Sequence, residues 1–578
     1  MIEQTTINGV PTLVAPASGP LRGGITFRVG RADESLPRSG ITHLVEHLAL
    51  HRFGLTDYHY NGATGSAATH FVSQGSPEHI RDYIDGVCTA LADLPFERLA
   101  MEKEILRTES ANRSRSAAEP LLLWRYGAQG YGLLAYPEWG LDAHTADDLR
   151  DWVSRYFTRD NAVLWFTGPP PPDLRVPLPS GERMPLPPTT SALPRTPAYF
   201  PGPPQAVALH TVITRSVAAQ VFAGVLEREL FRALRQEGGY SYAANAAYEP
   251  HDSRLATIVG LVDTHPEKQD AALGGFVDVL AKLRAGRVEQ GDIDAMLAKA
   301  REALREPDAD ANRLPVTAFD VLVGGPNQTA EEVLRQLDEV TVSDVHRVAK
   351  ESAENALLMV PQGLRGDWAG FDAAPTSSAT AIRGRRYPMR NGANCSLLVG
   401  PEGVSTTAPG SIATVRFDEC VAVLAWPDGG LVLVGNDGIT CSVEPTLYPI
   451  GATVRRRIEQ AVPPHLVVHL RPRAPDTVPQ PPALDRATER RLRRESPERR
   501  KRSERLDRLA PRIALALALV ALAACGGFFA VLRQPVGARN DSLGGAFFVV
   551  AIVATLAILW PLGRAMGKQA REPRLPPM

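Results

Sequence analysis

The segment SGITHLVEHLAL, residues 39–50, places two histidines and a glutamate on one predicted amphipathic helix. His43 and His47 stand four positions apart, so on a helix their imidazoles share one face and can bind one metal ion together. Glu46 precedes His47 and can contact a water molecule at that ion without being a ligand. Two imidazoles and a free carboxylate are the groups that metal-assisted hydrolysis needs. The alternative is a helix with a polar edge, whose histidines only satisfy local hydrogen bonds.

The bulk composition narrows the class of protein. The chain has 578 residues, enough for about three or four domains, and its formal net charge of −1 gives no bias toward nucleic acid. Its five cysteines form no CxxC pair, and their odd number argues against a disulfide framework and against a cysteine-based metal site. The first residues show no basic start followed by an apolar core, so we expect no secretory signal. These features suit a reducing compartment.

Two uncharged segments near the C-terminal end, residues 513–532 and 543–562, have the length that a helix needs to cross a membrane. Because the connection between them is short, we expect a transmembrane helical hairpin. Basic residues gather before and after the pair, which places both termini and the preceding domains in the cytoplasm. The sequence therefore predicts a two-pass protein of the cell membrane. A buried hairpin of a soluble domain is the alternative.

The rest of the chain divides into five regions. Residues 1–168 predict strands and helices around the segment quoted above, and residues 205–365 repeat this plan, which suggests an internal duplication. Proline-rich residues 169–204 predict an extended linker between these two units. Short strands, turn signals and one closing helix in residues 383–470 predict a small β-barrel-like domain, similar in pattern to pleckstrin-homology-like domains. Residues 471–512 are a linker and a basic stem.

Three segments resemble the pitrilysin and mitochondrial-processing-peptidase family, whose members carry the reversed zinc motif HxxEH. They are GRADESLPRSGITHLVEH (30–47), MEKEILRTES (101–110) and LRQEGGYSYAANA (234–246). The resemblance covers about residues 1–365 and implies a zinc metalloendopeptidase with one zinc ion per chain. It also implies the fold class: α+β, with two similar peptidase-type units, each an antiparallel sheet with helices, ahead of the barrel-like domain and the membrane hairpin.

The same resemblance assigns the metal ligands. It makes His43, His47 and Glu109 the ligands of the zinc ion, with Glu46 as the base that takes a proton from water. Glu102 stands seven positions before Glu109, as a second glutamate does in the family, and is expected beside the ligands rather than among them. The separation of His47 from Glu109, 62 positions, is shorter than is usual in the family, and the shortening falls in two connections. The alternative for Glu109 is an ordinary exposed helix residue.

The resemblance also implies a way to hold substrate. Arg235 and Tyr242, seven positions apart, match a pair that contacts the substrate carbonyl in the family. Alone, Arg235 would be a cation near the end of a helix, which is the commoner use. Residues 61–71 resemble the edge strand along which an extended substrate adds itself. The predicted substrate-binding residues are Asn61, Gly62, Ala63 and Thr64.

The number of units predicts the assembly. Family members enclose substrate in a chamber of four such units and this chain has two, so the resemblance implies a dimer with Arg235 and Tyr242 of one chain facing the zinc ion of the other. A homodimer is the simpler expectation, and a heterodimer with a related chain is the alternative. Such a chamber suits short or unfolded peptides. The rival function is a non-catalytic membrane scaffold or peptide-binding protein, but none of the predicted site residues is missing, which favours the enzyme.

Overall fold

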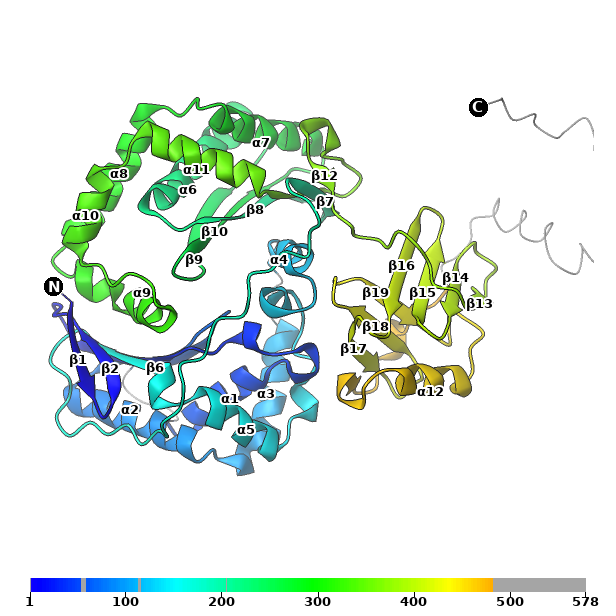
Figure 1. Cartoon of the computed structure of the whole chain (residues 1–578), viewed down its shortest axis with the longest axis horizontal. Helices are drawn as coiled ribbons and strands as arrows, with labels where there is room; N and C mark the ends of the chain where they lie inside the picture. The colour runs from blue at the N-terminus through cyan, green and yellow to red at the C-terminus, as the bar shows by residue number, and fades with distance from the viewer. Residues whose placement is uncertain (1, 54–58, 113–115, 204, 482–578) are drawn as a thin grey trace, which may run out of the picture. The chain divides into compact units, whose positions relative to one another are not determined.

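Figure 1 draws in colour the residues that the computed structural model describes, which are 2–53, 59–112, 116–203 and 205–481. The predicted membrane segments 513–532 and 543–562 lie outside these residues. Among the described helices, none combines the length and the apolar character needed to cross a membrane. Helices and sheets alternate through the described part of the chain, which confirms the mixed α and β composition that the sequence predicts.

The first α+β unit is built on a six-stranded sheet with the order β1-β2-β6-β3-β5-β4. Its strands are β1 (Glu3–Ile7), β2 (Val10–Val14), β3 (Leu21–Phe27), β4 (Tyr60–Thr64), β5 (Thr69–Gly75) and β6 (Ala162–Phe166). Its helices are α1 (Ile41–Leu50), α2 (Pro77–Ala92), α3 (Leu99–Asn112), α4 (Glu119–Tyr126) and α5 (Ala146–Tyr156). The sheet is mixed rather than purely antiparallel as predicted, because the chain returns to β6 through α5 and β6 then runs parallel to β2.

The second α+β unit repeats the strand order of the first. In its sheet, β12-β7-β11-β8-β10-β9, the last five strands take the places of β2, β6, β3, β5 and β4, and the pair β7–β11 is again parallel. The strands are β7 (Ala198–Gly202), β8 (Ala206–Thr214), β9 (Ala244–Pro250), β10 (Leu255–Asp263), β11 (Leu357–Pro361) and β12 (Asp372–Ala373). The helices are α6 (Val217–Leu230), α7 (Gln269–Arg284), α8 (Gln290–Arg305), α9 (Ala309–Val323), α10 (Ala330–Asp338) and α11 (Val342–Glu354).

Two strands of this second sheet fall outside the predicted bounds 205–365. β7 lies at the end of the predicted linker 169–204, because the prolines around it conceal a short strand that is held between β11 and β12. β12 follows residue 365 and has only two residues, too few for a sequence pattern. The unit therefore runs from β7 to β12.

Contacts made by α9 and by α4 are among those that join the α+β units. Figure 1 shows α1, α2, α3 and α5 on one side of the first sheet and α9 of the second unit on the other. There Leu314 of α9 belongs to one apolar cluster with Trp165 of β6. From α4, the guanidinium of Arg125 donates hydrogen bonds to the main-chain oxygens of His210 at 2.9 Å and Asn355 at 2.6 Å. Both faces of the first sheet are therefore covered.

The β-rich region contains two four-stranded sheets, β13-β14-β15-β16 and β19-β18-β17-β20, and helix α12. The predicted barrel does not form, because the eight strands pair into two separate sheets, whose end strands β13, β16, β19 and β20 each pair with one described strand. One apolar core is shared between the two sheets and α12. The elements are β13 (Arg385–Pro388), β14 (Ser396–Val399), β15 (Gly403–Ala408), β16 (Ser411–Arg416), β17 (Cys420–Ala425), β18 (Leu431–Gly435), β19 (Thr440–Val443), α12 (Ala452–Ala461) and β20 (Val467–His469).

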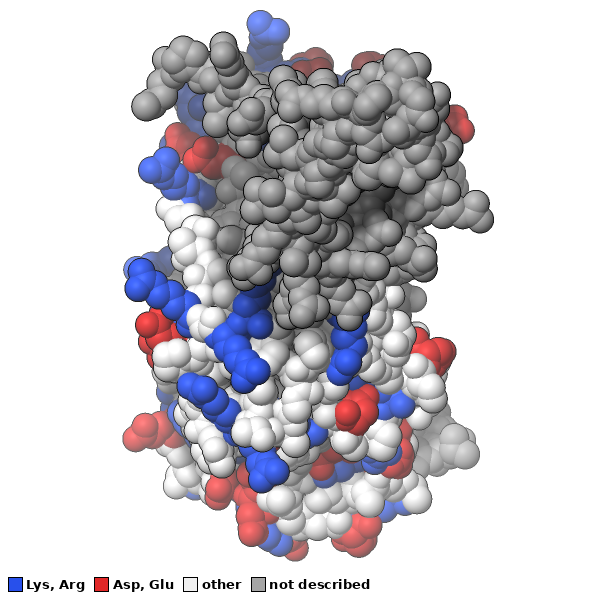
Figure 2. All heavy atoms as spheres, turned by 90° about the vertical axis from the view of Figure 1, so that its right-hand side faces the viewer, with Lys and Arg blue, Asp and Glu red and all other residues white. Residues whose placement is uncertain are grey.

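The outer surface of this region carries charged side chains of both signs. Figure 2 looks onto the side of the molecule where it lies and shows Lys and Arg side chains interspersed with Asp and Glu over the uncovered surface. Exposed arginines come from β13 and from α12, among them Arg385, Arg386, Arg456 and Arg457. Exposed acidic residues, among them Glu402, Asp418 and Glu419, give this surface charges of both signs. We refer to residues 385–473 as the β-rich domain, since Arg473 pairs with Asp428 and Glu444 within it.

Candidate metal centre

Helix α1 sets the direction of the motif side chains. Leu44, Val45 and Leu48 are fully buried in the core between α1 and the first sheet, which leaves His43 and His47 on the partly exposed edge of the helix. This arrangement follows from the helical period, since the apolar positions recur on one face and the two histidines lie one turn apart on another. The apolar face of α1 therefore determines where the imidazoles point.

A buried carboxylate holds the start of α1. Glu34 accepts hydrogen bonds from the main-chain nitrogens of Gly40 at 2.9 Å and of Thr42 at 3.0 Å. These are two of the amides that a helix N-terminus leaves without a partner. Burial raises the pKa of Glu34 to about 7, although both hydrogen bonds favour its charged form. Gly40 has a φ of 87°, a conformation that suits glycine, and so turns the chain into the helix.

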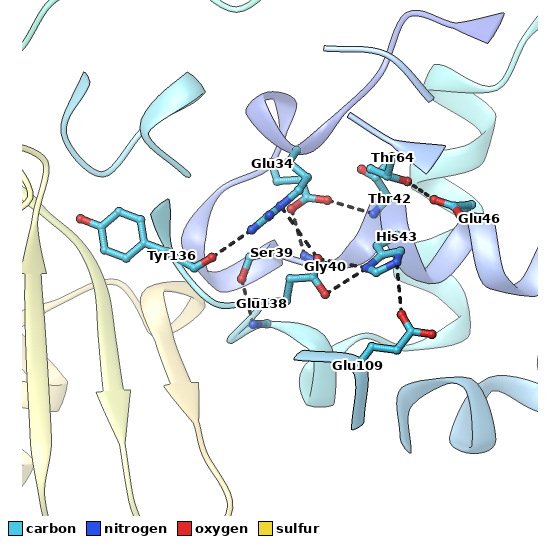
Figure 3. Close-up of polar contacts among 12 residues, drawn as sticks. Glu34, Ser39, Gly40, Thr42, His43, Glu46, Thr64, Glu109, Tyr136 and Glu138 are labelled. Carbon is cyan, nitrogen blue, oxygen red and sulfur yellow. Dashed lines mark hydrogen bonds and ion pairs between the residues drawn. The ribbon is translucent and has the colours of Figure 1, made fainter. Parts of the chain in front are cut away.

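The structure brings His43, His47 and Glu109 together, and Figure 3 shows His43 and Glu109 of this group. Glu109 lies on α3, and its Oε2 is 3.9 Å from Nε2 of His43 and 3.7 Å from Nε2 of His47. One ligand atom from each of the three residues lies within 4.8 Å of the other two. Two imidazole nitrogens and one carboxylate oxygen are the donor set of many catalytic zinc sites. The shortened separation between His47 and Glu109 therefore does not keep the three groups apart.

Each histidine ring is held from behind by a carboxylate. Nδ1 of His43 is 3.2 Å from Oε1 of Glu138, and Nδ1 of His47 is 3.4 Å from Oε2 of Glu102. When Nδ1 carries the proton and donates a hydrogen bond to the carboxylate, the lone pair of Nε2 faces Glu109 and is available to a metal ion. Glu102 thus lies beside the ligands, as the sequence predicts, and contacts Nδ1 of His47. Glu138 makes the corresponding contact with Nδ1 of His43.

Glu138 has no counterpart in the sequence prediction. It lies in the turn after the 3-10 helix η5 (Gly130–Ala135), and its side chain is 11% exposed. A single glutamate in such a turn carries no sequence signal. It lies 95 positions from His43 in the sequence, and only the fold brings the two side chains together. Burial alone would lower the pKa of His43, but the hydrogen bond and charge of Glu138 and the charges of Glu46 and Glu109 raise it overall.

Glu46 stands beside the group without joining it. It is 5% exposed, and its Oε2 accepts a hydrogen bond from Oγ1 of Thr64 at 2.6 Å. Burial raises the pKa of Glu46, while the Thr64 hydrogen bond and the charges of the two histidines lower it. A carboxylate with a raised pKa next to a possible metal site is suited to take up and release a proton.

The predicted substrate-binding residues lie on β4, the last strand of the first sheet. Among the described strands, β4 pairs only with β5, so its other edge is open to an added strand. Gly62 lies against the motif helix, since a Cβ placed on it would be 2.7 Å from Oε1 of Glu46 and 2.7 Å from Cδ1 of Leu50. Glycine therefore lets β4 approach the Glu46 carboxylate closely.

A cavity of about 290 Å³ opens beside His43 and Glu109. The carboxylate of Glu109 is half exposed toward solvent, and the cavity wall includes apolar residues of α3 and of the segment that follows η5. Its other lining residues are Arg31, Leu106, Ser110, Glu119, Leu134, Ala135, Tyr136, Pro137 and Glu138. The cavity provides space for a ligand next to the metal-binding group.

Arg235 and Tyr242 contact one another in the second unit. Arg235 lies on the π-helix η8 (Phe231–Glu237), which continues α6, and its guanidinium carbon is 5.1 Å from the centre of the Tyr242 ring. The Tyr242 side chain is an exposed hydrophobic group, and Asp263 holds its loop by accepting the Tyr242 main-chain N–H at 2.9 Å. No contact between the described residues joins this pair to the metal-binding group. The structure therefore does not bring the pair to the metal centre within one chain.

Comparisons with known proteins agree on the fold. No protein-family model and no curated protein sequence matches the chain. A protease from Helicobacter pylori matches with a TM-score of 0.54 and 17% identity, covering 63% of this chain and 99% of its own. The inactive domain of an M16 peptidase from Pseudomonas fluorescens matches with a TM-score of 0.52 and 14% identity over 63% and 98% of the two chains.

The first half of the periplasmic protease PqqL from Escherichia coli is a third match, with a TM-score of 0.50 and 13% identity over 64% of this chain and 93% of its own. The fold of this protein is thus that of M16-like peptidases, as the sequence resemblance predicts. At such low identity the likeness shows the fold alone. Since one of these structures is an inactive domain, the fold does not decide whether the chain is an enzyme.

Proposed function

We propose that this protein, whose fold is that of M16-like peptidases, is a zinc-dependent endopeptidase. The observation that carries the proposal is the convergence of His43, His47 and Glu109, with Glu46 next to them. The rival reading, a non-catalytic scaffold or peptide-binding protein, does not require these groups to converge. It also does not require a carboxylate behind each imidazole.

The residues present fit a zinc ion. Nε2 of His43, Nε2 of His47 and the Glu109 carboxylate would hold it, which leaves a fourth position for water or substrate. The carboxylates of Glu102 and Glu138 would orient the two rings. When bound, zinc supplies Lewis acidity that lowers the pKa of water toward neutrality and polarises a carbonyl group.

The side chains of this chain then perform the proton transfers. Glu46 accepts a proton from the attacking water at its carboxylate and passes it to the leaving amine, while Thr64 holds that carboxylate in place. An extended peptide adds to the open edge of β4 by main-chain hydrogen bonds, and Gly62 keeps this edge close to Glu46. This mode of binding suits short or unfolded peptides rather than folded proteins.

Arg235 and Tyr242, the pair expected to contact the substrate carbonyl oxygen, would come from a second chain. Because Arg235 and Tyr242 do not contact the metal-binding group within one chain, we propose a dimer in which each chain supplies this pair to the other. A homodimer accounts for both halves of the site with one sequence, and a heterodimer with a related chain remains the alternative assembly. Mixing equal amounts of inactive His43→Ala and inactive Arg235→Ala chains should restore about a quarter of the activity per site if sites are shared, because about half of the dimers are mixed and each of these has one intact site. Absence of any recovery would contradict the shared site.

The proposed location follows from the predicted membrane segments 513–532 and 543–562. Their flanking basic residues would keep both termini and the peptidase units on the cytoplasmic side of the cell membrane. A tethered peptidase would then act on peptides near that membrane surface.

The test uses the purified full-length chain in detergent, with Glu46→Gln beside the wild type and exposed Glu78→Gln as a matched control. We expect one zinc ion per chain in all three and cleavage of a quenched peptide mixture by wild type and Glu78→Gln. In Glu46→Gln cleavage should fall by at least about a hundredfold, the usual contribution of a general base. Lack of zinc in the wild type, or full activity of Glu46→Gln, would overturn the proposal.

A further inference from the structure

The β-rich domain presents a second apolar face to the first α+β unit. Along β18, Leu431 and Leu433 point into the domain's own core, while Val432 and Val434 point to the opposite side of the sheet. Val434 is fully buried there. The other members of this interface cluster are Leu36, Ala128, Leu133, Tyr136, Trp139, Val421 and Ala422. The domain is therefore packed against the first unit through a face that its own core does not use.

The turn after β18 fits closely onto the segment that follows α4. The main-chain nitrogen of Ala128 donates a hydrogen bond to the main-chain oxygen of Asn436 at 2.9 Å. A Cβ on Gly127 would overlap that oxygen, and one on Gly438 would lie 2.7 Å from Cδ1 of Leu123. Glycines on both sides of the interface thus permit a close approach of two main chains.

The contacted segments are the ones that carry the metal-binding group. β17 lies against the 3-10 turn η2 (Leu36–Arg38), which leads directly into α1 with its two histidines. Beyond β20, Arg471 pairs with Glu104 of α3 at 3.0 Å and with Asp142 at 3.2 Å. Helix α3 carries Glu109 one and a half turns further along. Two of the elements that supply ligands are therefore held by the β-rich domain.

The third contact involves the carboxylate behind His43. Tyr136 and Trp139 pack together, with ring centres 5.4 Å apart, and both lie against the interface cluster. Between them in the sequence, Glu138 points the other way, to Nδ1 of His43. Figure 3 shows this division, with the Tyr136 ring directed toward strands of the β-rich domain and the Glu138 carboxylate directed toward His43. A segment fixed on one side by the domain thus fixes the imidazole on its other side.

We infer that the β-rich domain positions the metal centre, and that its contact through Val434 and Arg471 sets the affinity and geometry with which the first unit binds its metal ion. This inference rests on the proposed function, because it assumes that His43, His47 and Glu109 bind zinc. Val434 and Arg471 are positioning residues that act through η2, α3 and the Glu138 segment. If the β-rich domain only packed against the first unit without positioning the ligands, substitutions at this contact would leave metal binding unchanged.

The test compares metal binding by full-length variants. Val434→Asp places a charge in the apolar interface without touching the residues of the domain's own core, and Thr440→Asp adds the same charge at an exposed position of the same sheet. For Val434→Asp we expect the zinc Kd to rise at least about tenfold, as it does at other metal sites when a group that orients the ligands is removed. Thr440→Asp and the conservative Val434→Ile should keep the wild-type Kd.

A spectroscopic readout separates positioning from general damage. At saturating cobalt, the visible absorption spectrum of Val434→Asp should differ from that of wild type and Thr440→Asp, because cobalt absorption follows ligand geometry. A folded Val434→Asp with wild-type Kd and spectrum would overturn the inference.

If Val434→Asp does not fold, the Arg471→Glu variant tests the inference instead. Arg471 is 56% exposed, so we expect this variant to fold, and its negative charge would lie beside those of Glu104 and Asp142. We expect its zinc Kd to rise about threefold, in keeping with the loss of exposed ion pairs. An unchanged Kd would overturn the inference. A wild type that binds no zinc would instead overturn the proposed function, and this inference with it.

Discussion

Replacement of Glu138 tests how far the hydrogen bond behind His43 supports the metal centre. Its two carboxylate oxygens lie 3.2 and 3.3 Å from Nδ1 of His43, and the side chain is 11% exposed. A hydrogen bond to a charged partner contributes about 1.5–3 kcal/mol, and these distances are at the long end of the range. We therefore expect the lower value, about 1.5 kcal/mol, for loss of the whole hydrogen bond, which corresponds to roughly a tenfold weaker zinc affinity.

Glu138→Ala removes the acceptor altogether, so its zinc affinity should fall by this factor of about ten, whereas Glu138→Gln keeps a neutral acceptor and should lose less. The assay is competition for zinc with a chromophoric chelator of known affinity at fixed pH, on the full-length chain. Glu97→Gln, which changes an exposed glutamate just before α3, is the matched control and should bind as wild type does. If Glu138→Ala binds zinc within about twofold of wild type, the orienting role of this carboxylate is refuted.

Three further predictions concern the base and the response to acid. Gly62→Ala should displace the Glu46 carboxylate, whose Oε1 would lie 2.7 Å from the new Cβ, and should lower kcat/KM about tenfold or more while the zinc content stays the same. Thr64→Val removes the 2.6 Å hydrogen bond that favours the charged form of Glu46, so its pKa rises further and the acid limb of the pH–rate profile should move to higher pH. Burial lowers the pKa of His144 to about 4, so between pH 6.5 and 4 the unfolded chain binds a proton that the folded chain does not. This histidine should cost about 3 kcal/mol of folding stability over that window, and denaturant unfolding at pH 7 and pH 4.5 should show a smaller loss for His144→Gln than for wild type.

The sequence predicts the centre of the site well because the relevant spacings are local. His43, Glu46 and His47 lie within two turns of one helix, so their relative positions follow from the helical period alone. The same holds for Glu102 and Glu109 on α3. The repetition of strand order in the two units is also visible in the order of predicted strands and helices.

What the sequence does not predict depends on contacts between distant segments. Glu138 reaches His43 across 95 positions, through a turn with no pattern of its own. The barrel prediction fails because pairing between distant strands decides whether a sheet closes, and the eight strands form two separate four-stranded sheets. Within the described part of one chain, Arg235 and Tyr242 contact one another but not the metal-binding group, and no local pattern encodes such a relation between distant segments. The neighbours of a side chain, rather than its own segment, decide these features.

The central claim is that His43, His47 and Glu109 bind one zinc ion. The most direct measurement is anomalous diffraction at the zinc absorption edge, from crystals of the full-length protein. We predict one strong peak per chain, about 2.0–2.2 Å from Nε2 of His43, from Nε2 of His47 and from a carboxylate oxygen of Glu109. A map without a peak among these three residues, from crystals grown with zinc, would contradict the account.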